Sequence, residues 1–489
     1  MSQTERPNVL LICTDHWGGH YLRTVGHPVV MTPTVHTLAQ NGVCYTNAYS
    51  AAPTCIPARR SLMTGTTART HGDRVFKEFE RMPDPKRFAT MPQCFRDAGY
   101  QAYAVGKLHV HPQRDRIGFD EVILIEEGRH HLDDGVADDW ELYLQDRGFA
   151  GQEYAAGHCN NDMITRAWHL PEACHPTHWV AREMCRTIVR RDPTKPAFWY
   201  LSFVGPHQPM WPLQAYMDLY RDVPMDDPVI GDWAKDEQKL PHFLRSRRAQ
   251  LSISNAPAHE IDLGRRAFYA CITHIDHQIR TVIGTLREQG LLGNTIIAFT
   301  ADHGEMLGDH GLWTKAYMYE RSNRIPLVIS LPPGDERLPR RAMDDRLVEI
   351  RDVMPTLLDL CRLETPSSVE GESLTSGPRR DYLYGEHGED AESSNRMIRD
   401  QRYKLIYYPM GNIVQLFDID ADPRETHNLA DDPDHARTRE RLTRLLVNQM
   451  YGEDDSWVQD GQLVGVPAPQ EMVYPDTRVL AAQRGHRFI

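Results

Sequence analysis

Two Asp-His pairs of this chain each follow an apolar run that has the length of a buried strand. Asp15 and His16 come after the run NVLLIC, and Asp302 and His303 come after TIIAFT. A buried carboxylate is costly unless it meets a cation. If the two pairs converge, they predict a divalent-metal site built from carboxylate oxygen and imidazole. Whether His16 is itself a ligand stays open.

Two further Asp-His pairs favour structural roles. Asp276 and His277 fall inside a long segment with helical periodicity, where consecutive residues point in different directions. Asp309 and His310 lie in the polar stretch GDHGLW, where a turn or a helix cap explains them as well as a site does. We therefore expect the chemistry at the pairs that end strands.

Basic side chains follow the same kind of apolar run. Lys107 and His109 lie in VGKLH, His207 lies between two prolines in VGPHQP, and Lys315 lies in GLWTK. Each of them alone is more typical of a solvated or hydrogen-bonded side chain. Together with a metal they form a pocket suited to a tetrahedral oxyanion ester, because the cations neutralise its charge and a histidine protonates the leaving group.

Cys55, in the stretch TCIPARRSLMTG, has several possible roles. A cysteine there is core filler, a redox thiol, a metal ligand or the precursor of another group. The chain has nine cysteines without regular spacing and no C-x-x-C pair, so neither a zinc ribbon nor a thioredoxin-like site is supported. We expect reduced and mostly buried thiols.

The elements that must position these residues alternate between strands and helices. This order predicts a doubly wound α/β sheet, in which ligands gather at the carboxyl ends of the strands. Helical patterns cover 34–42, 90–99 and 265–290. The expected buried parallel strands are residues 8–13, 101–105, 197–204, 295–300 and 326–331.

Composition divides the chain into two domains. A catalytic domain is expected over residues 1–365, with an insertion at about 110–195 whose periodicity is weaker. A Pro/Gly/Ser-rich link leads to a smaller α+β domain over 366–489, where RMIRDQRYKLIYY and NIVQLFDID alternate like an antiparallel hairpin. A helix is expected at about 433–450.

The net charge of −13 bounds the possible partners. An acidic surface repels nucleic acid and anionic membranes, so we expect neither as a partner. The N-terminal segment has no signal-peptide pattern and no apolar run is long enough to span a bilayer, which favours a cytoplasmic location. A homo-oligomer is possible.

Five motifs carry a resemblance to a known family. The stretch CIPARRSLMTG resembles the sulfatase signature, Cys-x-Pro-x-Arg followed by a Leu/Met-Thr-Gly element. PNVLLICTDHWGG, GYQAYAVGKLH, GPHQP and FTADHGEMLGDHGLWTK are similar to other sulfatase motifs in the same order, over roughly residues 7–360. LFDIDADPRETHNLA resembles the closing domain of that family. The resemblance implies an alkaline-phosphatase-like mixed sheet flanked by helices, and a smaller C-terminal domain with an antiparallel sheet.

The same resemblance implies a nucleophile and its maturation. Cys55 would be oxidised to formylglycine by a formylglycine-generating enzyme, which reads an element that includes Pro57 and Arg59. One hydroxyl of the hydrated aldehyde would attack sulfur or phosphorus, and the second would expel the ester as the aldehyde re-forms. Arg59 is similar to the arginine that holds the formylglycine.

The remaining roles also follow from the resemblance. Lys107 and Lys315 would grip the non-bridging oxygens of the substrate. His207 would contact the substrate and protonate the leaving alkoxide, and His109 would act as the base that breaks down the hemiacetal intermediate. The implied ligands of one divalent cation are Asp15, the modified Cys55, Asp302 and His303.

Two departures from the common sulfatase pattern affect the metal and the substrate. His16 stands where many sulfatases carry a second aspartate, and His303 stands where many carry asparagine. Calcium is the first expectation, but imidazole in place of a carboxylate makes manganese the alternative. The second departure is similar to phosphonate monoester hydrolases and to some sulfatases of sugars and choline. The expected substrate is thus a small anionic sulfate monoester, with phosphonate monoesters or phosphodiesters as the alternative and a non-catalytic oxyanion-binding protein as a third hypothesis.

Overall fold

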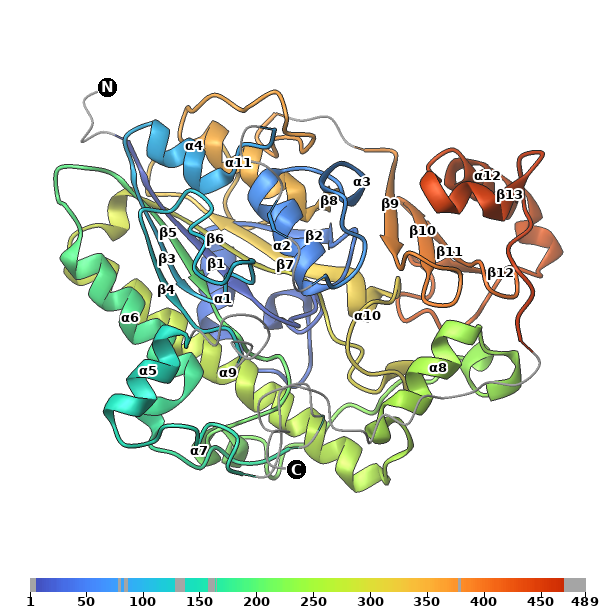
Figure 1. Ribbon diagram of the computed structural model, residues 1–489, viewed down its shortest axis with the longest axis horizontal. Coiled ribbons are helices and arrows are strands. Elements are labelled where there is room, and N and C mark those ends of the chain that lie inside the picture. Colours follow the sequence, from blue (N-terminus) through green and yellow to red (C-terminus); the bar gives the residue numbers. More distant parts are fainter. Residues whose placement is uncertain are drawn as a thin grey trace.

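A mixed eight-stranded sheet forms the centre of the molecule, and a four-stranded antiparallel sheet lies at one end of it (Figure 1). The computed structural model describes residues 6–77, 81–82, 87–127, 137–156, 163, 165–376 and 380–469. The large sheet has the order β4-β3-β5-β1-β6-β7-β2-β8. Its strands, in that order, are Glu121–Leu124, Gln101–Gly106, Ala197–Ser202, Asn8–Thr14, Thr295–Ala301, Arg324–Ser330, Gly42–Tyr49 and Ala342–Glu349.

All five strands expected from the sequence are present, but one runs in the opposite direction to the prediction. Strands β4, β3, β5, β1 and β6 are parallel to one another, whereas β7 pairs antiparallel with both β6 and β2. The reason is the connection between β6 and β7. The chain stays at the carboxyl end of β6 and enters β7 through the short helix α10 (Glu320–Asn323), without a crossover to the other end.

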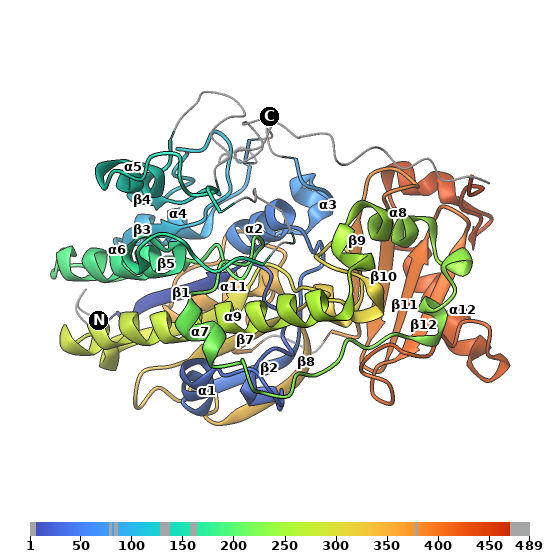
Figure 2. The same cartoon turned by 90° about the horizontal axis from the view of Figure 1, so that it is seen from below.

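Helices cover both faces of the large sheet (Figures 1 and 2). On one face α6 packs against the long α9, which also contacts α1 and α7. On the other face α2, α4 and α11 pack together. The helices of these two layers are α1 (Pro33–Gln40), α6 (Pro176–Arg190), α7 (Gln214–Asp218), α9 (Ala258–Glu288), α2 (Cys55–Thr64), α4 (Met91–Asp97) and α11 (Val353–Leu360).

The sheet interior is formed almost entirely by apolar side chains. Every residue of β1 and of β6 is buried, which is typical of central strands covered on both faces. Asp276, which sits on the buried face of α9, accepts hydrogen bonds from the backbone N–H groups of Thr34 and Val35 at 2.9 Å each. This carboxylate satisfies the start of α1, so the predicted structural role of Asp276 is confirmed.

The C-terminal part of the chain forms an α+β unit. Strands β9 (Tyr382–His387), β10 (Asn395–Asp400), β11 (Tyr403–Tyr408) and β12 (Ile413–Asp418) build an antiparallel sheet in sequence order. The predicted final helix appears as α12 (Ala436–Val447), preceded by a 3-10 turn at Pro433–His435. A short pair, β13 (Val458–Gln459) and β14 (Gln462–Leu463), follows. Residues 470–489 of the predicted second domain lie outside the described residues.

The small sheet shares an apolar cluster with elements of the first domain. Phe243 on α8 (His242–Gln250), Tyr317 and Tyr319 in the loop before α10, and Met397 and Phe417 on the small sheet belong to one buried cluster. Figure 2 shows α8 lying beside this sheet. The loop that carries Lys315 is therefore held from both domains, and the boundary at residue 365 stays a prediction.

The remaining described helices are short. The insertion predicted at 110–195 contains α5 (Asp139–Asp146) and α6, and α3 (Ala68–His71) follows α2. Among the described residues, no helix is both long enough and apolar enough to cross a bilayer.

Candidate functional site

The register of the parallel strands brings the predicted residues to one edge of the large sheet. Thr14 of β1 pairs with Ala301 of β6, so Asp15 and Asp302 leave the sheet side by side. On the other side Gly106 of β3 pairs with Ser202 of β5, so Lys107 leaves the sheet at the same level. A side chain at Gly106 would lie 1.7 Å from the Ser202 carbonyl oxygen, so glycine is required at this strand end.

Cys55 is the first residue of helix α2. Its Sγ lies 3.7 Å from Asp15 Oδ1 and 3.3 Å from His303 Nε2. The side chain is 1% exposed. One turn later on the same helix, Arg59 points back to the strand ends, which explains the spacing of Cys55 and Arg59 in the sequence.

Arg59 joins four parts of the strand edge. Its Nε donates to Asp302 Oδ2 at 2.9 Å, and one terminal nitrogen donates to Ser202 Oγ at 2.8 Å, to the Lys107 carbonyl at 3.0 Å and to the Tyr200 hydroxyl at 3.2 Å. The other terminal nitrogen, Nη2, is buried without a hydrogen-bond partner and lies 3.7 Å from Asp15 Oδ2. The guanidinium therefore fixes the strand ends and keeps one donor directed at the cluster.

Four side chains present atoms that a metal ion can bind within 4.8 Å of one another. They are Asp15, His16, Cys55 and His303, all of them buried. The Asp15 Oδ1 atom lies 3.5 Å from His303 Nε2 and 3.7 Å from His16 Nε2. Ligands that each lie about 2.2 Å from a common ion are separated by about 3–4 Å, so these distances fit one divalent cation.

The hydrogen bonds of the two histidines orient them as ligands. The Nδ1 atom of His16 lies 2.8 Å from Glu305 Oε2, and Nδ1 of His303 lies 3.1 Å from the Gly304 carbonyl. A proton on Nδ1 satisfies each of these acceptors and leaves the Nε2 lone pair facing the cluster. A histidine that binds a metal typically makes this kind of hydrogen bond with its other nitrogen. The donor set thus fits a metal. His16 is one of its four residues, although its Nε2 atom also lies within hydrogen-bond distance of Lys315 Nζ.

Asp302 is not one of these four residues, although it lies next to them. Its Oδ2 accepts from Arg59, and its Oδ1 accepts from the His303 backbone N–H at 2.9 Å and lies 3.7 Å from His303 Nε2. The predicted ligand role of Asp302 stays a prediction, because both of its oxygens already accept hydrogen bonds.

Lys107 is fully buried between two carboxylates. Its Nζ forms ion pairs with Asp15 Oδ2 and, at 2.8 Å, with Glu127 Oε1. Glu127 was missed by the sequence analysis, since nothing in the stretch ILIEEG marks it. The residue follows β4, where β4 lies beside β3, and its backbone has φ 58°, a left-handed conformation that a glutamate rarely adopts.

Lys315 connects two of the histidines. Its Nζ lies 2.7 Å from His16 Nε2 and 3.0 Å from His207 Nε2. The Nδ1 atom of His207 faces the Gln208 carbonyl at 2.5 Å, so the proton is on Nδ1 and Nε2 accepts from the Lys315 ammonium. His207 also lies 3.8 Å from Glu127 Oε1.

The charges of the cluster shift the protonation equilibria of its members. Burial alone would raise the pKa of Asp15, but Lys107 and the histidines hold it well below its usual range. Burial lowers the pKa of His303, yet Asp302, Cys55 and Asp15 outweigh it and raise it to about 9. Burial and the Lys315 charge lower the pKa of His207 to about 3. The Asp15 side of the cluster therefore attracts a proton or a cation, and the Lys315 side attracts an anion.

His109 is buried close to this cluster. It has φ 61°, its backbone N–H donates to Glu126 Oε1 at 2.8 Å, and its ring packs edge-on against Phe76 with centroids 5.1 Å apart. Phe76 lines the cavity described next, so the His109 ring contacts the wall of that cavity through Phe76. Its predicted role as a base stays a prediction.

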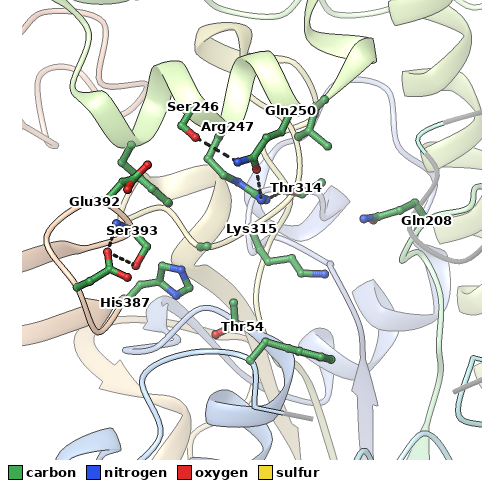
Figure 3. A pocket seen from close by; sticks show the side chains of 15 residues that line it. Thr54, Gln208, Ser246, Arg247, Gln250, Thr314, Lys315, His387, Glu392 and Ser393 are labelled. Atoms are coloured by element: carbon green, nitrogen blue, oxygen red, sulfur yellow. Dashed lines mark hydrogen bonds between the residues drawn. The ribbon is translucent and has the colours of Figure 1, made fainter. Parts of the chain in front are cut away.

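A cavity of about 520 Å³ opens onto Lys315 (Figure 3). Thr54, Gln208, Thr314 and Lys315 line its inner part, and α8 together with the β9–β10 connection lines the rest. Cys55, next to Thr54, is covered below this lining. The outer wall comes from residues 243–251 and 387–393, in which the sequence analysis identified no motif.

The fourth Asp-His pair supports the surrounding loop. The Asp309 carboxylate pairs with Arg321 at 2.7 Å and with Arg424 at 2.9 Å, and His310 Nδ1 accepts from the Gly231 N–H at 3.1 Å. These contacts tie the loop before Lys315 to the C-terminal domain. The structural explanation of this pair is confirmed.

Two family models match this chain, and several known proteins are similar to it. The sequence model of the family described as Sulfatase matches residues 7–363, and the model described as N-sulphoglucosamine sulphohydrolase, C-terminal, matches residues 308–451. An arylsulfatase of Clostridium perfringens is 33% identical over 94% of this chain and 97% of the relative. A choline-sulfatase of Rhizobium meliloti is 28% identical over 88% of this chain and 83% of the relative.

A solved structure has the same fold. The phosphonate monoester hydrolase of Agrobacterium radiobacter superposes with a TM-score of 0.77 at 25% identity, over 91% of this chain and 95% of that chain. The mixed sheet flanked by helices and the small antiparallel sheet agree with this likeness, so the predicted fold class is confirmed.

Proposed function

Because the chain belongs to the sulfatase family, whose members hydrolyse sulfuric esters, we propose that it cleaves sulfate monoesters with a formylglycine made from Cys55 and one divalent cation. The observation that supports this most is the position of Cys55. Its Sγ lies within 4 Å of Asp15 Oδ1 and His303 Nε2 at the start of α2. The sulfur marks where a formylglycine oxygen would lie, between the metal-binding atoms and the substrate cations.

The residues present fit both groups. Asp15, His16, His303 and the converted Cys55 would hold the cation, with Asp302 as the further candidate through its link to Arg59. A bound cation supplies Lewis-acid activation, and the hydrated formylglycine supplies a hydroxyl nucleophile that a thiol cannot replace. The single carboxylate and two imidazoles in the four-residue group make manganese a stronger competitor of calcium than the sequence alone suggested.

The chain's own residues then bind and orient the ester. Lys107 and Lys315 neutralise the non-bridging oxygens of the sulfate, and Arg59 and Glu127 hold Lys107 and Asp15 in place. The leaving alkoxide receives its proton from His207, whose Nε2 atom lies 3.0 Å from Lys315 Nζ. An arriving anion raises the proton affinity of His207, which prepares it as the acid. His109 remains our candidate for the base in the second half of the reaction.

Maturation must precede complete folding. Cys55, Pro57 and Arg59 are buried in α2, so a formylglycine-generating enzyme cannot read them on the folded chain. We therefore propose that this partner acts on the unfolded or nascent protein. Mass spectrometry of the peptide that carries residues 55–59, from the native host, tests this step, and a fully unmodified thiol there would contradict the mechanism.

A phosphonate monoester or phosphodiester hydrolase is the second candidate. The Asp302-His303 pair and the likeness to a phosphonate monoester hydrolase favour it. Side-by-side turnover of an aryl sulfate and an aryl phosphonate monoester by the converted, metal-loaded enzyme decides between the two. We expect the higher kcat/KM for the sulfate, and a phosphonate preference of orders of magnitude would reject the sulfatase assignment.

A further inference from the structure

The outer wall of the cavity contains an arginine that no carboxylate neutralises. Arg247, on α8, donates to Thr314 Oγ1 at 3.0 Å and to Gln250 Oε1 at 3.4 Å (Figure 3). Its Nε atom is buried and has no hydrogen-bond partner. Within the described part of the chain, this guanidinium forms no ion pair with an Asp or Glu oxygen within 4 Å. A guanidinium in this state retains its full affinity for an anion.

The two acidic residues of the cavity rim are engaged elsewhere. Glu392 pairs with His242 Nε2 at 3.1 Å. Asp390 accepts from the backbone N–H and the hydroxyl of Ser393 at 2.8 Å and 3.0 Å. Both carboxylates belong to exposed residues, whereas Arg247 is partly buried. The electrostatic attraction of the inner cavity for anions is therefore weakened only at its mouth.

Arg247 lies next to the cation that we assign to the sulfate. Its hydrogen-bond partner Thr314 directly precedes Lys315 in the sequence. The side chains of Arg247 and Lys315 line the same cavity. A single sulfate on Lys315 would leave Arg247 unmatched. Two anionic groups on one small molecule would match both cations.

The rest of the wall suits a hydroxylated organic group. His387 is buried, and its Nδ1 has no hydrogen-bond partner. Burial and the Arg247 charge lower the pKa of His387 to about 3, so its ring is neutral and accepts a hydrogen bond from a hydroxyl. Ser246 and Gln250 add further polar groups, and Phe76 and Phe243 supply apolar ring surface.

We propose that Arg247 determines specificity by binding a second anionic group on the alcohol part of the substrate. The substrate class is a sulfate ester of a hydroxylated alcohol or phenol that carries a carboxylate or a second sulfate. This inference rests on the proposed sulfatase function. It distinguishes the chain from an enzyme for cationic esters, because a positive charge beside Arg247 and Lys315 is repelled.

A matched series of aryl sulfates tests the proposal with the converted, metal-loaded enzyme. The series carries a carboxylate, a second sulfate, a neutral carbamoyl or a trimethylammonium group, each at the meta and para positions. We expect kcat/KM to be at least about 10-fold higher for an anionic member than for its carbamoyl counterpart, with the trimethylammonium compound slowest. Comparison of the carboxylate and sulfate members identifies the anion that Arg247 prefers.

Variants of α8 then assign the preference to one side chain. Arg247→Gln should remove the anion preference by about 10- to 100-fold and leave turnover of the carbamoyl compound unchanged. Arg247→Lys should restore part of the preference, since it keeps the charge. Arg245→Gln, on the same helix but outside the cavity lining, is the control and should keep the wild-type ratio. Unchanged carbamoyl turnover also verifies that Arg247→Gln folds.

The possible results distinguish a failure of the role inferred for Arg247 from a failure of the proposed sulfatase function. A wild type that prefers the carbamoyl or trimethylammonium compound, or an Arg247→Gln variant that keeps the anion preference, overturns the role of Arg247 while the sulfatase function stands. Absence of turnover for every aryl sulfate in fully converted wild type overturns the sulfatase function, and the inference with it.

Discussion

Two regions of the molecule bury charged side chains to the same degree but arrange them differently. At the carboxyl edge of the large sheet, Asp15, Cys55 and His303 turn their acceptor atoms toward one another. In the C-terminal domain, the Asp454 carboxylate faces two arginines instead. Arg74 donates to its Oδ1 at 2.8 Å, and Arg396 donates to both of its oxygens at 2.7 Å.

The two regions differ in whether all their buried polar groups have hydrogen-bond partners. Every nitrogen of the Arg396 guanidinium has an acceptor, because Asp454 and the backbone carbonyls of His387, Gly388 and Asn395 match them. At the sheet edge, Arg59 Nη2 has no hydrogen-bond partner, and Asp15, His16, Cys55 and His303 bring four potential metal-binding atoms within 4.8 Å of one another, although Lys107 pairs with the second oxygen of Asp15. A closed network stabilises the fold, whereas an open one predicts a ligand.

The largest expected effect is the loss of the nucleophile. Cys55→Ala removes the precursor of formylglycine, so kcat/KM for aryl sulfates should fall by about 10⁴-fold or more. The melting temperature should change little, because the open network contributes little to the fold. Steady-state kinetics and differential scanning calorimetry on the same sample measure both. Cys94→Ala, on α4, is the control and should keep its activity; an active Cys55→Ala enzyme would exclude the mechanism.

The next effect depends on the leaving group. His207→Ala should slow esters of poor leaving groups by about 10²- to 10⁴-fold and good leaving groups much less, since only the former need protonation. A series of aryl and alkyl sulfates gives the slope of log kcat/KM against leaving-group pKa, which should steepen in the variant. Equal losses across the series would assign His207 to binding instead.

The positions of Asp15, Lys107, His207 and Asp302 were predictable because strand ends in a parallel sheet share one edge. Five strands and the main helices also followed from apolar runs. The direction of β7 was not predictable, since it depends on whether the chain crosses over after β6. Strand β4 was missed because it has only four residues, and β8 because it carries charged residues, as in AMDDRLVE. In β2, GVCYTNAY, the polar residues Thr46 and Asn47 interrupt the apolar run.

The site residues that the sequence analysis did not find were missed for a different reason. Glu127 and Glu305 reach the cluster through strand pairing and loop conformation, at 2.8 Å from Lys107 and from His16. Arg247 reaches the cavity because α8 packs on the small sheet, 67 residues before its hydrogen-bond partner Thr314. Carboxylates and arginines are frequent on surfaces, so sequence type alone does not separate these from solvated residues.

The third prediction concerns the closed network and is the opposite of the first: stability should fall while activity is retained. Asp454→Asn leaves Arg396 and Arg74 buried without their shared carboxylate, so the free energy of unfolding should fall by about 3–5 kcal/mol. The value of kcat/KM at 25 °C should stay near that of the wild type. Urea denaturation and aryl sulfate turnover measure the two quantities. A variant that loses activity but no stability would remove the distinction between the two regions.

The smallest effect comes from a buried charge group that joins the two domains. Lys404 Nζ contacts Glu320 at 2.7 Å and Glu425 at 2.9 Å. Burial, against the Lys404 charge, raises the pKa of Glu425 from 4.5 to about 7, while Lys404 and neighbouring arginines overcome burial and lower that of Glu320 to about 2. Between pH 4.5 and 7 the unfolded chain therefore loses a proton that folded Glu425 keeps.

This difference sets the sign of the pH dependence. The free energy of unfolding should fall by about 1–3 kcal/mol as the pH rises through this window, because the folded state binds more protons there. Glu320 adds no slope in this window, since its contribution is lost only as the pH falls from about 4.5 toward 2. Glu425→Gln should remove the decline, whereas Glu440→Gln on the exposed side of α12 should retain it. Urea melts at pH 4.5, 5.5, 6.5 and 7.5 measure the slopes, and an identical slope in wild type and Glu425→Gln would contradict the raised pKa of Glu425.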